Sequence, residues 1–573
     1  MHQAYRRTLV VCPDVCCPFG TVPFADDGPD GEERKGLPVL VVDEEIYRHP
    51  PSLLIGTVDK FAQLPWRGET TTLFGRASRR CERHGLVTDD LAAKDWEHER
   101  HQPTPEAPAA RIIGVPMLRP PDLIIQDELH LIAGPLGSLV GLYEGAVDRL
   151  AIWPDPRTAR NIRPKVIAST ATVRRANQQI GSLFNRATEV FPPPGLSADD
   201  NFFARQRDTA TTPGRRYVGI CAHGARIKST LIRVYVSVLG AAQKLHIRYG
   251  RNRVTDPYMT LVGYFTSLRD LGGMRRLAED DVSTRLARAD ERGLAKRFEP
   301  EIRELTSRLS SDQIRPLLDL LAVPFPRGAG RNAPRPIDVL LATNMIAVGV
   351  DVSRLGVMVV CNQPKSTAEY IQATSRVGRA APGLVFTVYN WARPRDLSHY
   401  ESFEHFHATI YRYVEALSVT PFAERAVDRG LTGVLVSLVR ELDPAYNGNL
   451  RAQDFNKNSQ LADHVVRYLR RRAEEVSGRE TSRRVDDELQ DRLDNWDRQW
   501  STPGRRLAYS QPLQADDIAG LLHRPTEGPW RHTTCPTSLR DVEPGIPLLL
   551  QPPGGYLSTE PPFHPPAGPE VAV

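Results

Sequence analysis

Two adjacent carboxylates, Asp127 and Glu128, stand directly after an apolar run in the stretch PDLIIQDELHLIAG. Two like charges side by side are costly unless water, a cation or a hydrogen-bonding partner compensates them. A solvated turn after a strand is the simplest interpretation of an isolated Asp-Glu pair. A bound cation is the second interpretation, and it would give the pair a chemical role. The choice depends on which residues stand after the other apolar runs.

Short polar clusters stand after those runs in the same way. In chain order they are GTVDKF (56–61), QDELH (126–130), STAT (169–172), YFTSLRD (264–270), ATNMIAVGVDV (342–352) and YIQATSRVGR (370–379). Each cluster alone is weak evidence. The ordered set is strong evidence for one shared site, because ligands of open α/β sheets bind outside the carboxyl ends of the strands.

The apolar runs predict two α/β units. LPVLVVD (37–43), PSLLIGTVD (51–59), DLIIQDE (122–128) and KVIASTAT (165–172) alternate with helical stretches, which is typical of buried parallel strands. A second series of Val- and Leu-rich runs, MTLVGYFTS, IDVLLATN, GVMVVCN and GLVFTVYN, occurs later in the chain. The sequence therefore predicts an α/β fold with two parallel-sheet lobes.

The composition between these runs sets the expected domain boundaries. A stretch rich in Pro, Gly and polar residues separates the two series, and the chain becomes helical and charge-dense after the second. We expect a partial first lobe at 1–190, a linker at 191–216, a second lobe at 217–395 with a helical insertion at 278–336, a helical C-terminal extension at 396–540 and a disordered Pro-rich tail at 541–573.

The composition is that of a soluble globular protein. The 573 residues are 40% hydrophobic and 25% charged, with a net charge of +5. No run approaches the roughly 20 apolar residues of a membrane span, and the first residues lack the apolar core of a secretory signal. Seven Cys, unevenly spread, do not form a disulfide framework. We expect a cytoplasmic protein that does not bind membranes.

The polar clusters resemble the motifs of superfamily 2 helicases, whose motor consists of two RecA-like lobes with ATP between them. DELH is similar to their D-E-x-H box, STAT to their S-A-T motif, and QATSRVGR to their Q-x-x-G-R-x-G-R motif, with Ser375 in place of the first Gly. The similarity spans roughly residues 53 to 390. Two longer stretches, PPDLIIQDELHLIAGPLGSLVGLYE and LSHYESFEHFHATIYRYVEALSVTPFAERAVDRGL, resemble the helicases of DISARM phage-defence systems (DrmA-like proteins).

The resemblance implies roles for the motif residues, with ATP and Mg²⁺ as cofactors. Asp127 would hold Mg²⁺ and Glu128 would position the attacking water, so that the cation compensates the paired charges. His130 would couple the site to the second lobe. Arg376 and Arg379 would reach phosphate oxygens across the cleft as arginine fingers do. The expected nucleotide-binding residues are Gln372, Gly349, Asp351, Ser169 and Thr170.

Nucleic-acid contacts are expected where the family places its strand-binding motifs. The residues there are Thr57, Lys60, Ser267, Arg269 and Thr343. The aromatic segment 400–417 offers another candidate, since single strands stack on aromatic side chains. Its aromatic and aliphatic residues recur every three to four positions, however, which favours a helix face packed on a core.

One motif of such a motor is absent from the sequence. No G-x-x-x-x-G-K-[ST] loop, which cradles phosphates in this fold, precedes Asp127. HGARIKST (223–230) has Ile227 at the second Gly position and lies after the STAT motif, so we interpret it as a strand-to-helix turn. The chain therefore resembles the family without its amino-terminal portion. A split gene, a truncated gene and a degenerate copy would all explain this.

Several cysteines have the spacing of metal ligands. Cys12 and Cys16 (or Cys17) are four or five residues apart, and Cys81 and His84 are separated by two residues. Together they could supply four soft ligands to a structural Zn²⁺. The long separation between the two pairs leaves free cysteines as the alternative.

Taken together, these patterns predict an ATP-dependent helicase or translocase of superfamily 2 that acts in phage defence. Its expected partners are nucleic acid (DNA rather than RNA), other defence subunits and a polypeptide that carries the absent phosphate loop. The alternative is a non-catalytic remnant that binds nucleic acid or scaffolds a complex.

Overall fold

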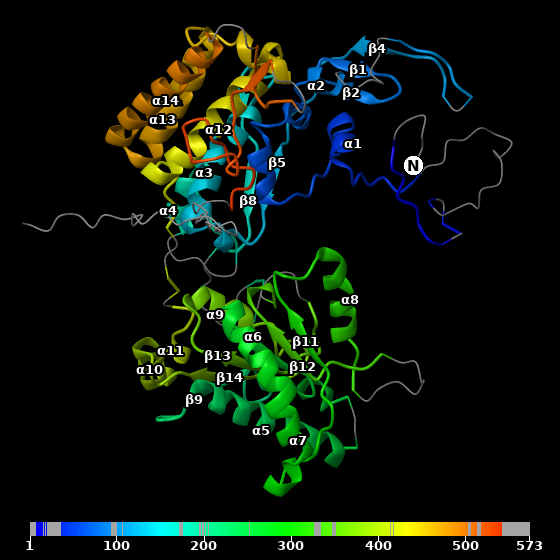
Figure 1. Cartoon of the computed structure of the whole chain (residues 1–573), viewed down its shortest axis with the longest axis vertical. Helices are drawn as coiled ribbons and strands as arrows, with labels where there is room; N and C mark the ends of the chain where they lie inside the picture. Colours follow the sequence, from blue (N-terminus) through cyan, green and yellow to red (C-terminus); the bar gives the residue numbers. More distant parts are fainter. Residues whose placement is uncertain are drawn as a thin grey trace, which may run out of the picture.

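The fold comes from a computed structural model of the chain. The structure describes residues 7–14, 16–17, 19, 36–92, 100–105, 107–170, 176–193, 196, 200, 202–203, 205–250, 253–325, 334–346, 351–412, 414–415, 418–501, 506–512 and 517–540. These residues form two bodies (Figure 1). The first body, uppermost in the figure, contains the described residues within 36–184 and 418–540, and the second body contains those within 216–412.

The second body is built on a six-stranded parallel sheet. Its strands are β9 (Arg216–Cys221), β10 (Leu261–Phe265), β11 (Ile302–Leu305), β12 (Val339–Ala342), β13 (Val357–Cys361) and β14 (Leu384–Tyr389). They lie in the order β11-β12-β10-β13-β14-β9, and every neighbouring pair is parallel. The four strands predicted in this half of the chain are confirmed as β10, β12, β13 and β14.

Both faces of this sheet are buried, which explains the continuous apolar runs. Successive side chains of a strand point to opposite faces. In β12, Val339 and Leu341 enter one hydrophobic core, whereas Leu340 and Ala342 enter the core on the other face. The residues of such a strand are therefore mostly apolar, and the sequence loses the polar alternation of a half-exposed strand.

Helices cover the sheet on both sides. They are α5 (Ile227–Arg248), α6 (Leu268–Leu277), α7 (Ser283–Ala287), α8 (Ser311–Leu321), α9 (Thr367–Thr374), α10 (Pro394–Glu401) and α11 (Phe403–Ala408). The core on one face includes residues of α5 and α6, and the core on the other includes residues of α9. The HGARIKST segment lies between the end of β9 and the first turn of α5, as a strand-to-helix turn should.

The insertion at 278–336 is not purely helical, and this part of the prediction is wrong. It contains β11, which pairs with β12 at the edge of the sheet. The sequence of β11, IREL, buries only Ile302 and Leu305 at its ends. An edge strand has one neighbour, so Arg303 and Glu304 can remain in the middle and hide the apolar pattern.

The first body is mainly helical. Its long helices are α3 (Gly134–Leu150), α4 (Ala176–Phe184), α12 (Glu424–Leu442), α13 (Gln460–Ser477) and α14 (Arg479–Trp500). All five helices contribute to one hydrophobic core, although about 240 residues separate α4 from α12 in the chain. Two short strands, β15 (Arg506–Ala508) and β16 (Ile518–Gly520), pair beside them and add Leu507 to this core.

Among the described residues, the parallel sheet expected for the first body consists of two strands. β5 (Leu123–Gln126) pairs with β8 (Lys165–Ala168). The inner faces of both strands pack on the helical core, but the outer face is open: Leu123, Ile125 and Ile167 are 47%, 62% and 47% exposed. The prediction of a parallel pair is confirmed here, and the prediction that these strands are fully buried is wrong.

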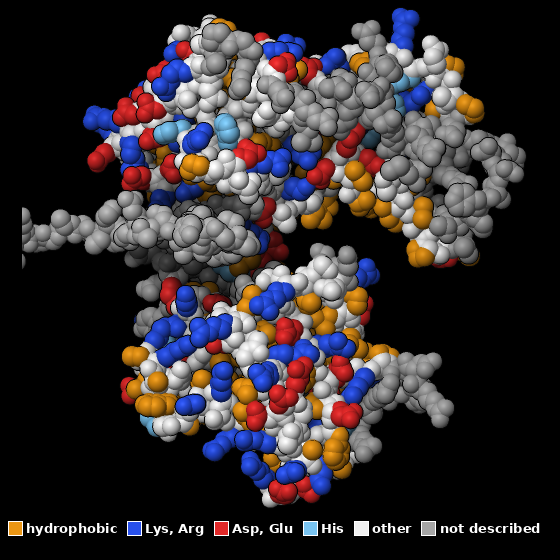
Figure 2. All heavy atoms as spheres, viewed as in Figure 1, with side chains coloured by type: hydrophobic (Ala, Val, Ile, Leu, Met, Phe, Trp, Pro, Cys, Tyr) orange, Lys and Arg blue, Asp and Glu red, His pale blue; other side chains and the backbone are white. Residues whose placement is uncertain are grey.

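The two predicted strands before β5 are also wrong. Residues 37–43 lead into α1 (Asp43–Arg48), and residues 51–59 lead into a 3-10 helix, η1 (Val58–Gln63). Val41 and Ile55 are exposed, because no strand among the described residues pairs with these segments. Figure 2 shows apolar side chains gathered along the lower edge of the first body.

A small antiparallel sheet lies beside α1 (Figure 1). It consists of β1 (Arg79–Cys81), β2 (Gly85–Val87), β3 (Arg100–His101) and β4 (Ala110–Gly114), in the order β2-β1-β4-β3. A second 3-10 helix, η2 (Gly68–Phe74), precedes it, and α2 (Asp89–Ala92) comes after β2. A separate pair, β6 (Trp153–Pro154) and β7 (Asn161–Ile162), lies between α3 and β8.

The aromatic segment after the second sheet packs on that sheet, as its periodicity predicts. The Tyr400 ring lies 5.9 Å from the Tyr389 ring of β14, and Phe403 lies against Gly219 of β9. His407 contacts Tyr217 and Tyr370, with ring centroids 4.8 and 5.7 Å away.

Within the described part of the chain, no helix combines the length and the apolar content needed to cross a membrane.

Candidate functional site

The two carboxylates lie in a tight turn at the carboxyl end of β5. Glu128 has φ 51° and ψ 46°, a left-handed conformation that costs a side-chain-bearing residue about 1–2 kcal/mol. The turn is held because the next residue, Leu129, is fully buried and its N–H donates to the Ser169 carbonyl at 2.9 Å. Asp127 Oδ1 accepts a hydrogen bond from the Glu128 N–H at 2.9 Å. Asp127 is exposed and Glu128 is half-buried.

The STAT motif begins beside this turn. Ser169 comes directly after β8, and its N–H donates to the Gln126 carbonyl at 2.9 Å. Its hydroxyl donates to Asp127 Oδ1. The Thr170 hydroxyl lies 3.4 Å from Nδ1 of His130. The parallel pairing of β5 with β8 therefore brings the start of STAT onto DELH, while Ala171 and Thr172 lie outside the described residues.

His130 connects the two bodies. It is buried, and its Nδ1 lies 3.4 Å from a Glu128 carboxylate oxygen. Gln372, on α9 of the second body, places its amide nitrogen 3.3 Å from the same Nδ1 and hydrogen-bonds Nε2. Burial lowers the pKa of His130, and this outweighs the opposite effects of Glu128, the Gln372 hydrogen bond and Asp127. The imidazole is therefore neutral at pH 7.

The two arginines come after α9 on the second body. Burial lowers the pKa of Arg376, the positive charge of Arg379 adds to this effect, and the negative charges of Glu128 and Asp351 oppose it. Arg379 forms an ion pair with Asp351. Gly378 makes the turn between the arginines possible: its φ is 78°, and a Cβ there would lie 2.6 Å from the Gly383 Cα.

The result is a cluster of opposite charges contributed by both bodies. Asp127 and Glu128 come from the first body, and Arg376, Arg379 and Asp351 come from the second. Carboxylate and hydroxyl oxygens such as those of Asp127 and Ser169 are ligands that Mg²⁺ accepts. Arginines can bind phosphate oxygens through two parallel hydrogen bonds. Gly349, another predicted nucleotide contact, lies outside the described residues.

Some predicted strand-binding residues already make contacts within the protein. The Ser267 hydroxyl caps α6, where it accepts from the Asp270 N–H at 3.1 Å. Lys60 forms an ion pair with Asp43 at 2.8 Å. The other three residues differ in exposure: Thr57 and Arg269 are exposed, and Thr343 is buried directly after β12. Their role in binding nucleic acid stays a prediction.

The cysteine prediction requires a correction. Cys81 and His84 lie together, but the side chain that joins them is His101. Neither Cys12 nor Cys16 belongs to this group, and Cys17 is also outside it. The prediction missed His101 because β3 and β1 are separated in the chain and both pair with β4. A His in a short polar segment gives little signal by itself.

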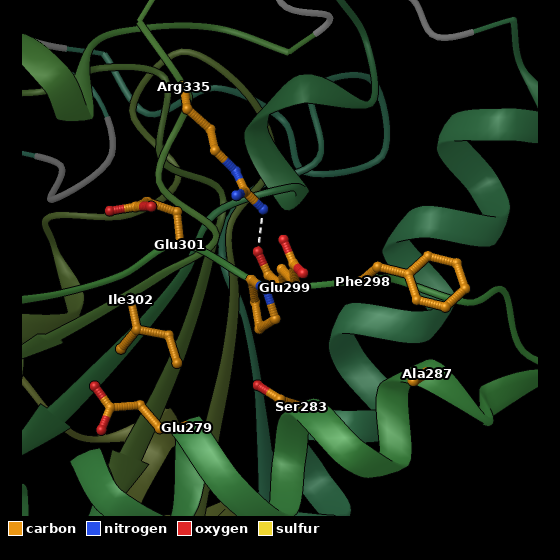
Figure 3. A pocket seen from close by; sticks show the side chains of 9 residues that line it. Glu279, Ser283, Ala287, Phe298, Glu299, Glu301, Ile302 and Arg335 are labelled. Atoms are coloured by element: carbon orange, nitrogen blue, oxygen red, sulfur yellow. Dashed lines mark hydrogen bonds between the residues drawn. The ribbon is translucent and has the colours of Figure 1, made fainter.

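A pocket of about 530 Å³ lies elsewhere in the second body (Figure 3). It is lined by residues of α7 and of the segment that leads into β11, at the edge of the sheet. Glu299 and Glu301 contribute carboxylates, and Arg335 donates a hydrogen bond to the Glu299 carbonyl. None of the residues predicted for the site lines this pocket.

Comparison with known proteins agrees with the motifs. Residues 327–381 match the helicase conserved C-terminal domain. The DISARM protein DrmA of Bacillus paralicheniformis (strain ATCC 9945a / NCIMB 11709 / CD-2) is 43% identical over 463 residues, which cover 80% of this chain and 40% of DrmA. The chain thus spans less than half the length of this relative. The predicted resemblance to superfamily 2 helicases and to the DISARM helicase is confirmed.

Two solved helicase structures are also similar in part. The DUF1998 helicase MrfA bound to DNA and AMPPNP is 19% identical, has a TM-score of 0.38, and is matched over 55% of this chain and 37% of MrfA. The Mycobacterium smegmatis helicase Lhr bound to ssDNA and AMP-PNP is 16% identical, has a TM-score of 0.39, and is matched over 65% of this chain and 38% of Lhr. Both TM-scores are below 0.5.

Proposed function

We propose that this chain, a relative of the DISARM protein DrmA with the motifs of a superfamily 2 helicase, is part of an ATP-driven motor that moves along nucleic acid in phage defence. The observation that carries the proposal is the contact between the two bodies. Gln372 reaches His130, and Arg376 lies within the field of the Glu128 charge. A nucleotide held there would be touched by both bodies, so its hydrolysis would change how they sit together.

Each residue of the cluster has a role in this proposal. Asp127 and Ser169 would hold Mg²⁺, which would neutralise phosphate charge when bound. Glu128 would orient the attacking water, because its carboxylate lies near His130 while Asp127 takes the contact with Ser169. Arg376 and Arg379 would bind phosphate oxygens from the second body. The Arg379–Asp351 ion pair would then open, leaving the guanidinium free to turn toward phosphate.

The finer assignments rest on the same relative and are proposals too. We propose DNA as the nucleic acid, other defence subunits as partners and the cytoplasm as the location. Since the motor also needs backbone donors for the phosphates, we propose that a segment with the G-x-x-x-x-G-K-[ST] pattern completes the site. A second candidate function is nucleic-acid binding without hydrolysis. It is favoured by the absence of that pattern before Asp127 in the sequence.

The test is ATP hydrolysis with and without DNA, for this chain alone and with a polypeptide that carries the phosphate loop. We expect slow hydrolysis by the chain alone and DNA-stimulated hydrolysis when the loop is supplied. In the active mixture, Glu128→Gln should abolish turnover and retain nucleotide binding. Arg379→Ala should slow turnover by roughly 10³-fold. Asp122→Asn, at the opposite end of β5, is the matched control and should change neither turnover nor nucleotide binding.

Two results would contradict the proposal. Unchanged turnover in both Glu128→Gln and Arg379→Ala would show that the charge cluster does not act in hydrolysis. DNA binding without turnover, whatever loop is supplied, would favour the second candidate. Fast hydrolysis by the chain alone would leave the motor in place and contradict the need for the supplied loop.

A further inference from the structure

Three metal-binding side chains converge in the small antiparallel sheet of the first body, away from the charge cluster. The Cys81 sulfur and one ring nitrogen each of His84 and His101 all lie within 4.8 Å of one another. Cys81 is completely buried, His84 is almost so, and His101 is half-buried. A thiol and two imidazoles form a donor set that suits Zn²⁺ better than Mg²⁺ or Ca²⁺, which prefer oxygen.

The fold of the sheet brings these ligands together. Cys81 is the last residue of β1, and a tight turn then places His84 beside it, with the His84 Nδ1 3.6 Å from the sulfur. Gly85 has φ 94°, and a Cβ there would lie 2.4 Å from the Arg48 carbonyl oxygen, so the turn requires glycine. His101 lies on β3. This strand pairs with one edge of β4, and β1 pairs with the other edge.

The spacing of Cys81 and His84 agrees with one tetrahedral ion, and the His101 nitrogen lies within 4.8 Å of both. Zn–S and Zn–N bonds of about 2.3 and 2.0–2.1 Å at a tetrahedral angle place the sulfur and the nitrogen roughly 3.6 Å apart. The Cys81–His84 separation is 3.6 Å. The His84 and His101 rings are perpendicular with centroids 4.8 Å apart, so their nitrogens can approach one ion from different sides.

The ion would add a cross-link to a small sheet whose β2 strand is already buried. Its strands are only two to five residues long, so each strand pair forms few backbone hydrogen bonds. The segment after β2 carries Asp90, which forms an ion pair with the fully buried Arg440 of α12 and accepts the Asn449 N–H at 2.6 Å. An ion that fixes the β1–β2 turn would therefore also fix the segment that docks on α12.

We propose that Cys81, His84 and His101 bind one structural Zn²⁺ ion, with water in the fourth position. Binding replaces the proton of the Cys81 thiol by the metal, and both imidazoles bind as neutral ligands. The ion ties β3 to the β1–β2 turn. This site is independent of the proposed motor, because none of its ligands belongs to the charge cluster.

The test measures metal content and cobalt spectra of the full 573-residue chain. We expect one Zn²⁺ per chain after purification with zinc, and a thiolate-to-metal charge-transfer band after exchange to Co²⁺. Cys81→Ser should lose the band and the ion, and His101→Ala should lose the ion. Cys221→Ser is the matched control, because Cys221 lies outside the group, and it should retain both.

A conservative variant keeps the test decisive if the alanine variant does not fold. His101→Cys should bind Co²⁺ with a stronger charge-transfer band, because it supplies a second thiolate. A wild-type chain that contains no metal after zinc loading, and whose unfolding is unchanged by a chelator, would overturn the site and leave a Cys81–His84 hydrogen bond. His101→Ala with a full Zn²⁺ complement and an unchanged Co²⁺ spectrum would remove His101 from the ligand set.

Discussion

At the residue scale, the molecule buries titratable side chains whose protonation depends on their surroundings. Glu144 is an example outside the charge cluster. It lies on α3 with 2% of its surface exposed, near Asp148 and Arg472. The pKa of Glu144 is raised from 4.5 to about 7, chiefly because burial disfavours the charged form; Arg472 and Arg186 oppose this rise, and Asp148 adds to it. The folded state therefore holds a proton on Glu144 at pH values where the unfolded chain has lost it.

This difference predicts how stability depends on pH. Because the folded pKa is raised, the protonated Glu144 stabilises the fold fully below about pH 4.5, and this contribution is lost as the pH rises toward 7. The loss is about 3 kcal/mol from a shift of this size. Glu144→Gln cannot ionise and should be more stable than the wild type at pH 8, with a smaller difference at pH 5. Urea unfolding from pH 5 to pH 8 measures the free energy of unfolding of both proteins. The same dependence of this free energy on pH in the two proteins would contradict the prediction.

At the element scale, the first body depends on close packing between α3 and α12. Gly430 and Gly433 of α12 allow the approach, and Gly141 of α3 makes room for Pro421 of the segment before α12. A Cβ at Gly141 would lie 2.6 Å from Pro421, and a Cβ at Gly430 would lie 2.9 Å from Leu142. At Gly433 it would lie 2.0 Å from the Tyr143 hydroxyl, and Tyr143 is fully buried. The absence of a side chain at these glycines therefore allows the close contacts around α3 and α12.

The packing predicts opposite effects for two Gly→Ala changes in helices. Gly433→Ala should destabilise the protein by about 1–3 kcal/mol, because the methyl group must displace Tyr143 or α12. Gly181→Ala in α4 has nothing within 4 Å of the added Cβ and should be neutral, or stabilising by up to about 1 kcal/mol, because alanine favours helix. Thermal unfolding of the two variants checks this pair. Equal changes in unfolding temperature for the two variants would mean that helix propensity, and not close packing, determines the effect of Gly→Ala.

At the scale of the whole molecule, the chain crosses twice between the bodies, before β9 and again between α11 and α12. The second crossing is anchored on α3, where the Gly134 N–H donates to the Ser418 carbonyl at 2.8 Å and the Thr420 N–H donates to the Ser138 hydroxyl at 3.1 Å. The His130–Gln372 hydrogen bond joins the same two bodies through side chains. Removing it should leave each body folded and loosen their arrangement.

Gln372→Ala tests this arrangement. We expect a larger radius of gyration in small-angle X-ray scattering than for the wild type, with an unchanged unfolding temperature, because the amide contacts His130 and does not belong to a hydrophobic core. Lys365→Ala, an exposed residue just before α9, is the control and should leave the scattering unchanged. Superimposable scattering curves for Gln372→Ala and the wild type would show that this contact does not hold the bodies together.

The sequence determined most of the second body. Burial on both faces of a parallel sheet favours apolar residues at nearly every position, so the runs at β10, β12, β13 and β14 are visible without any structure. The motif order then places Asp127 and Ser169 at the ends of two strands. A polar pair directly after an apolar run lies within one short stretch of sequence, so it can be recognised without knowing what that stretch contacts.

Only the tertiary structure decided which segments meet. The runs at 37–43 and 51–59 are as apolar as true strands, but a strand forms only with a partner, and the run itself does not specify one. The same reason hid His101, which reaches Cys81 through the pairing of β3 with β4. It also hid the common core of α3 and α12, because periodicity can show that a helix has a buried face but not which distant segment packs on it.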